Sequence, residues 1–137
     1  MVKLIMGLKG SGKTKRLVKM VCDAAADEKN DVVVIEKERN LTYDIPHNVR
    51  LIDAGSYDIG SYELLRGLIC GIRAGNYDIT HIFIDNFLKL AGDKSPEAFS
   101  SFIKWLKKFS DDENIEFTLS VSADAGTALE DVKAYII

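Results

Sequence analysis

The sequence is poor in proline and cysteine. The first shortage argues against a chain of several linked domains, and the second against a disulfide-rich or cysteine-ligated metal protein. Two prolines among 137 residues and no low-complexity stretch leave no candidate linker, so we expect a single domain over residues 1–137. The two cysteines, Cys22 and Cys70, have neither CxxC nor metal-ligand spacing. This pattern predicts free thiols in a reducing compartment, and cytoplasm is the expected location.

Long apolar runs are also missing. No run approaches the roughly 20 residues that a membrane-spanning helix needs. A signal peptide is not expected, because Lys3, Gly7 and Lys9 interrupt any apolar segment at the start. We therefore expect no membrane association.

Acidic residues are absent from the first twenty positions, which hold six basic residues, whereas the whole chain has a net charge of −3. An acidic chain is a poor candidate for nucleic-acid binding, which depends on neutralising phosphates. A basic segment at one end favours a small anionic ligand instead. A protein partner or an oligomer is compatible with the sequence, which identifies neither.

The hydrophobic pattern alternates between short apolar runs and amphipathic stretches. Strands are predicted at residues 2–6, 31–36, 49–53, 81–85 and 115–121, and helices at 13–28, at 61–74, from 95 onward and, briefly, near residue 130. Thr127 and Glu130 fit a capping box for that last helix. This order predicts an α/β three-layer sandwich, a mostly parallel five-stranded sheet with helices on both faces. Sites in such sheets lie at the carboxyl ends of the strands.

One motif stands at such a position. Residues 7–14, GLKGSGKT, match G-x-x-x-x-G-K-[ST] in full, between a predicted strand and a predicted helix. We call this segment the glycine loop. Its glycines let the backbone wrap so that N–H groups face phosphate oxygens, and the helix N-terminus adds partial positive charge. Lys13 would bind the β- and γ-phosphates, and the Thr14 hydroxyl would bind Mg²⁺.

The motif resembles the Walker A loop of the P-loop NTPase family. The resemblance implies a nucleoside triphosphate, with ATP and Mg²⁺ as the bound species. The order of strands and helices resembles the family over the whole chain, but only the glycine loop is a motif specific to the family. The candidate nucleotide-binding residues are Gly7, Leu8, Lys9, Gly10, Ser11, Gly12, Lys13, Thr14, Lys15 and Ser122.

The family also implies an acid at the end of an apolar strand, which holds Mg²⁺. Asp53 and Asp85 both end such runs. We favour Asp85 because the strand before it is longer and more apolar. Thr14 and Asp85 are therefore the candidate metal ligands, and Asp53 is more typical of a cap at a strand end.

The sequence offers Glu36 as the candidate for the base that activates water. Many P-loop ATPases follow the metal-binding Asp with a Glu, and this chain has Asn86 there. Glu36 ends the second strand, where some recombinase-like relatives place the base. The candidate catalytic residues are thus Lys13, Asp85 and Glu36. Ser122, in preference to Ser120 or Asp124, would sense the γ-phosphate.

These features favour Mg–ATP binding with slow hydrolysis. One alternative is a small-molecule kinase, which would need an acceptor pocket, for example between the 36–48 loop and the 61–74 helix. The lack of any arginine after Arg73 disfavours it, since kinases of this family carry arginines in a late lid. The other alternative is a non-catalytic ATP-sensing module, which Asn86 favours.

The expected specificity for the nucleobase of the ligand follows from a missing motif. Guanine-reading members of the family use N-K-x-D, and this chain has no such sequence. We expect competition binding to show a preference for ATP over GTP. A clear preference for GTP would contradict this assignment.

Overall fold

The computed structural model describes residues 1–38, 41 and 44–137 and contains one five-stranded sheet. The strands are β1 (Val2–Gly7), β2 (Val32–Glu36), β3 (Arg50–Asp53), β4 (His81–Ile84) and β5 (Glu116–Ser122). Their order across the sheet is β1-β5-β4-β2-β3, and every neighbouring pair is parallel. The predicted α/β fold class is confirmed, with a sheet that is all-parallel rather than mostly so.

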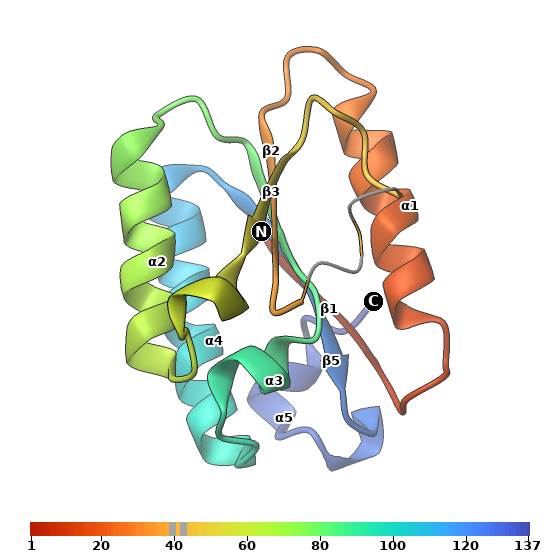
Figure 1. Ribbon diagram of the computed structural model, residues 1–137. Coiled ribbons are helices and arrows are strands. Elements are labelled where there is room, and N and C mark those ends of the chain that lie inside the picture. The colour runs from red at the N-terminus through yellow and green to blue at the C-terminus, as the bar shows by residue number, and fades with distance from the viewer. Residues whose placement is uncertain (39–40, 42–43) are drawn as a thin grey trace.

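Helices cover both faces of the sheet, as Figure 1 shows. Helix α1 (Lys13–Ala25) lies on one face, and α2 (Tyr62–Gly75) and α4 (Pro96–Glu113) lie on the other. The short helices α3 (Phe87–Ala91) and α5 (Glu130–Lys133) contribute to the α2–α4 side. No helix among the described residues is both long and apolar enough to cross a membrane.

Alternating strand residues build two separate hydrophobic cores. In β2, Val33 and Ile35 join the core beneath α2 and α4, whereas Val32 and Val34 join the core beneath α1. Successive side chains of a strand point to opposite faces, so a strand buried on both sides must be apolar throughout. This explains why the β2 sequence reads as an unbroken hydrophobic run.

Two local features differ from the sequence-based expectation. Helix α3 was not predicted, because five residues are too few to show a helical period. The predicted capping box at Thr127 is wrong. Thr127 lies in the 3₁₀ turn Ala125–Thr127, its hydroxyl donates to the Asp124 carbonyl at 2.7 Å, and α5 begins after Leu129 without a side-chain cap.

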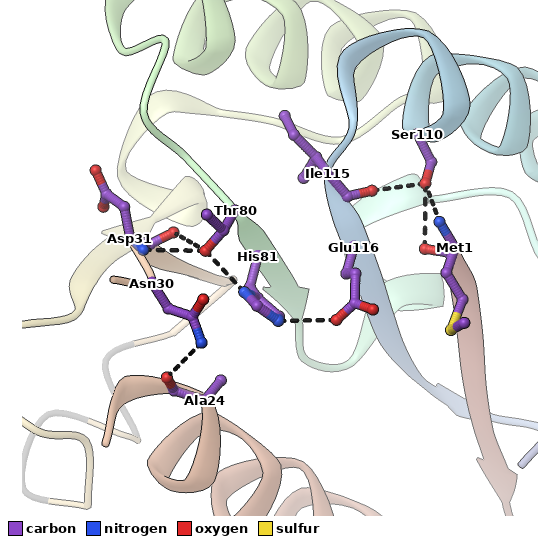
Figure 2. Close-up of polar contacts among 9 residues, drawn as sticks. All are labelled: Met1, Ala24, Asn30, Asp31, Thr80, His81, Ser110, Ile115 and Glu116. Carbon is purple, nitrogen blue, oxygen red and sulfur yellow. Dashed lines mark hydrogen bonds and ion pairs between the residues drawn. The ribbon is translucent and has the colours of Figure 1, made fainter. Parts of the chain in front are cut away.

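Polar contacts tie the strands together at their amino ends (Figure 2). His81 Nε2 on β4 lies 2.8 Å from a carboxylate oxygen of Glu116 on β5. The Thr80 hydroxyl contacts His81 Nδ1 at 2.8 Å and accepts from the Asp31 N–H, before β2, at 3.0 Å. These contacts stabilise the amino ends of the strands. The glycine loop lies at the opposite end of the sheet, because it follows the carboxyl end of β1.

Candidate functional site

The glycine loop turns sharply between β1 and α1. Gly10 and Gly12 both have φ of 86°, a left-handed conformation that glycine adopts without strain. A Cβ added at Gly7 would come within 2.4 Å of Ser11 Oγ, so this position has little room for a side chain. The Ser11 N–H donates to the Leu8 carbonyl at 3.1 Å, which closes the turn.

The N-terminus of α1 lacks the side-chain cap that the other long helices have. Ser61 and Ser95 accept hydrogen bonds from backbone N–H groups of α2 and α4, whereas Gly12 caps α1 and offers no side chain. The first turn of α1 also contains no acid. Its N–H groups are therefore directed at the loop with the positive end of the helix dipole, an arrangement suited to an anion.

Lys13 lies across the loop rather than out in solvent. Its side chain is largely covered, with 8% exposure, and Nζ donates to the Leu8 carbonyl at 3.0 Å. The ammonium group is thereby held at the concave side of the glycine loop. An anion placed there would meet a full positive charge together with the α1 N-terminus.

A hydrogen-bonded cluster joins the loop to the centre of the sheet. The Thr14 hydroxyl lies 3.1 and 3.2 Å from the two carboxylate oxygens of Asp85, which is 4% exposed and directly follows β4. Ser120, fully buried on β5, donates to Asp85 Oδ1 at 2.5 Å and accepts from the Asn86 N–H at 2.9 Å. Three elements, α1, β4 and β5, thus position one carboxylate.

This cluster separates the two candidate acids. Asp53 ends β3, the edge strand, and β2 lies between β3 and β4. Its carboxylate accepts from the Ser56 hydroxyl at 2.6 Å, in the turn that follows β3. The geometry therefore favours Asp85 as the acid of the site and leaves Asp53 with a local role.

Glu36 lies beside Asp85. Strands β2 and β4 pair at Ile35 and Ile84, so the next residue on each strand reaches the same edge of the sheet. Glu36 is 3% exposed and lines a small cavity together with Lys37, Glu38, Asp85, Asn86 and Lys89; we call it the side cavity. The structure thus brings all three candidate catalytic positions, including Lys13, to one end of the sheet.

Asn86 adopts a left-handed conformation, with φ of 50° and ψ of 52°. Asparagine tolerates this conformation better than most residues. The turn reverses the chain between β4 and α3 while its N–H bonds Ser120. Asn86 therefore has a backbone role that its place after Asp85 in the sequence did not indicate.

A cleft of about 640 Å³ opens over the glycine loop, and we call it the main cleft. Gly7, Leu8 and Ser11 shape the loop but do not line this cleft. Its lining consists of Lys9, Gly10, Gly12, Lys13, Thr14, Lys15, Asn86, Leu88, Lys89, Lys94 and Ser122. Sequence reasoning missed Leu88, Lys89 and Lys94, which α3 and the turn after it supply.

The last strand contributes Ser122. It pairs in register with Gly7, is exposed, and lines the main cleft. Asp124, the other exposed alternative, accepts from the Gly126 N–H at 2.9 Å within the next turn. Of the three alternatives on this segment, only Ser122 faces the main cleft, because Ser120 bonds Asp85 instead.

The donor set suits Mg²⁺ bound together with a substrate. Magnesium is usually held by one or two carboxylates plus substrate phosphates and water, not by an all-protein cage. Within the described part of the chain, no group of three or more His, Cys, Asp or Glu side chains could form such a cage. A hydroxyl that donates to Asp85 keeps its lone pairs for a cation, so Thr14 and Asp85 fit as a shared pair of ligands.

The chain was compared with protein-family models and with curated proteins. No protein-family model matches the chain, and no curated protein matches it. The functional argument therefore depends on the site itself.

Ser120→Ala tests whether the buried cluster holds the site together. The substitution removes the donor to Asp85 and the acceptor for the Asn86 N–H, which we expect to lower the free energy of unfolding by about 1–3 kcal/mol. Ser122→Ala is the matched control, two residues along the same strand and exposed, with an expected change below about 0.5 kcal/mol. Urea unfolding measures both. Equal stability of the two variants would show that the cluster contributes little.

Proposed function

We propose that this chain is a P-loop protein that binds Mg–ATP in the main cleft and hydrolyses it slowly. The observation that carries the proposal is the hydrogen bond between Thr14 and Asp85. A complete phosphate-binding motif and a buried strand-end carboxylate, 71 positions apart in the chain, meet there. A glycine-rich turn without a ligand would not require a buried acid at that point.

In this proposal each part of the glycine loop has a defined task. Backbone N–H groups at the start of α1 would bind phosphate oxygens, and Lys13 would exchange its bond to the Leu8 carbonyl for bonds to the β- and γ-phosphates. Thr14 and Asp85 would hold Mg²⁺, which neutralises charge on the phosphates when bound. Ser120 would keep Asp85 in its orientation.

Glu36 is the proposed general base. It is buried at the edge of the side cavity with Asp85, so it can accept a proton from a water molecule placed there. Asn86 cannot serve, because an amide does not accept a proton as a carboxylate does. We expect slow turnover because Asn86 stands where many P-loop ATPases place the glutamate that activates water.

A specific observation favours each alternative function. The left-handed Asn86 in place of a glutamate favours a nucleotide-sensing module. Lys89 and Lys94 favour a kinase, because they add positive charge to the main cleft outside the glycine loop. Part of the 36–48 loop lies outside the described residues, so the acceptor pocket predicted there stays a prediction.

Lys13→Ala tests nucleotide binding. Loss of the ammonium group that would pair with the phosphates should reduce ATP affinity at least about tenfold. Isothermal titration calorimetry with Mg–ATP measures the change, and Lys19→Ala, an exposed α1 residue paired with Asp23, is the control. Unchanged affinity in a folded Lys13→Ala protein would reject the assignment.

Glu36→Gln tests the proposed base. A positioned base contributes about 10²–10⁴-fold in rate, so single-turnover phosphate release should fall within that range while ATP affinity is retained. Glu28→Gln, in the loop after α1, controls for the change of charge. Asn86→Glu is a weaker probe, because the left-handed backbone costs a glutamate about 1 kcal/mol.

The wild-type rate separates the functions. Release faster than about 1 s⁻¹, within the usual enzyme range, would contradict slow turnover. Tight ATP binding without any release would assign the protein as a nucleotide sensor.

A further inference from the structure

Helix α3 holds a single lysine at the main cleft. Four of its five residues, Phe87, Leu88, Leu90 and Ala91, are buried in the core, and Lys89 is the exposed one. The helix is therefore anchored on its apolar side and presents one cation. Lys89 lines both the main cleft and the side cavity that contains Asp85, so it lies at the Asp85 end of the cleft.

The turn after α3 contributes a second lysine, Lys94, to the main cleft. Gly92 has φ of 74°, and a Cβ there would come within 2.5 Å of the Gly60 carbonyl oxygen, so the turn is packed tightly against the segment before α2. The Tyr62 hydroxyl donates to the Asp93 carbonyl at 3.1 Å. Burial, assisted by the charge of Asp93, raises the pKa of Tyr62 to about 12, so the hydroxyl remains a donor at neutral pH.

These contacts fix the backbone on either side of Lys94. The Ser95 N–H donates to Asp93 Oδ1 at 2.8 Å, and the Ser95 hydroxyl caps α4. Lys94 is thus held in a defined turn that lines the main cleft. Preorganised cations bind an anion with less loss of conformational entropy than mobile ones do.

The charge of the main cleft is one-sided. Among the residues that the structure describes, five lysines and no carboxylate line it, although the whole chain carries a net charge of −3. Among the described residues, Lys89 and Lys94 form no ion pair, whereas lysines elsewhere, such as Lys107 and Lys108, pair with aspartates. In the proposed complex, Lys13, Mg²⁺ and the α1 N-terminus would balance the charge of the triphosphate on the side of the glycine loop. The opposite wall therefore carries positive charge beyond that need.

We propose that Lys89 and Lys94 form a second oxyanion subsite, which binds the phosphate or carboxylate group of a small second ligand opposite the glycine loop. The proposal rests on the proposed function, because it places this ligand beside the γ-phosphate of bound ATP. The position of Lys89 near Asp85 and Glu36 puts the second ligand at the reacting end of the nucleotide. Such a ligand is the anionic substrate class that a kinase acceptor would belong to.

The test compares two double variants of equal charge. Lys89→Gln/Lys94→Gln removes the subsite, and Lys19→Gln/Lys29→Gln removes the same charge outside the cleft. Each protein is saturated with the Mg²⁺ complex of a β,γ-imido ATP analogue and titrated with inorganic phosphate and, separately, with acetate. Two-dimensional NMR of the ¹⁵N-labelled protein locates the binding. The two probes distinguish a phosphate-bearing from a carboxylate-bearing ligand.

We expect phosphate, acetate or both to shift the amide signals of residues 86–95 in wild type and control. The affinity should fall at least about tenfold in Lys89→Gln/Lys94→Gln, since charge-assisted hydrogen bonds are lost. Affinity for the analogue should fall less than affinity for the second anion, because Lys13 and the α1 N-terminus would bind its phosphates directly. Equal anion affinity in both double variants, or no binding of either anion to wild type, would overturn the proposal.

Two further outcomes separate this proposal from the one it rests on. If the subsite variant binds the analogue at least about tenfold more weakly but binds Mg–ADP normally, Lys89 and Lys94 contact the γ-phosphate, and the second subsite is rejected. If wild type does not bind the analogue, the nucleotide proposal fails. Phosphate is then titrated into Lys13→Ala and into the same protein that also carries Lys89→Gln/Lys94→Gln. The difference between their phosphate affinities tests the second subsite by itself.

Discussion

The site depends on one buried carboxylate. Asp85 receives hydrogen bonds from Thr14 on α1 and from Ser120 on β5, and its own backbone N–H bonds the Ile35 carbonyl of β2 at 3.0 Å. A buried carboxylate with few donors would be costly, so these bonds offset the cost of burying the Asp85 side chain. They also join the glycine loop to three central strands. Movement of any one element would alter the position of the acid.

Left-handed backbone conformations place the surrounding groups. Gly10 and Gly12 turn the chain into α1, Asn86 turns it from β4 into α3, and Gly92 turns it from α3 toward α4. Each reversal keeps its segment at the carboxyl edge of the sheet. The two walls of the main cleft are therefore made by short turns between packed elements, which limits how far the backbone at the lining lysines can move.

The distribution of charge follows from this arrangement. The glycine loop supplies lysines from one wall, and α3 with the turn after it supplies Lys89 and Lys94 from the other. The acids Asp85 and Glu36 are buried and line the side cavity, together with the exposed Glu38, rather than the main cleft. An anion entering the main cleft would thus meet lysines, whereas the acids line the neighbouring side cavity.

The sequence by itself determined the fold class, because apolar periodicity is a local property of the chain. The glycine–lysine–threonine spacing is also local, so the sequence placed this motif between a strand and a helix. It narrowed the acid to Asp53 or Asp85, since both end apolar strands. Only the tertiary structure shows which of the two contacts Thr14, because strand order, with β3 at the edge and β4 at the centre, is not written in local sequence. Lys89 and Lys94 escaped prediction for the same reason. Their position on the main cleft depends on α3 packing four apolar residues into the core, and a five-residue helix is too short to show a helical period in the sequence.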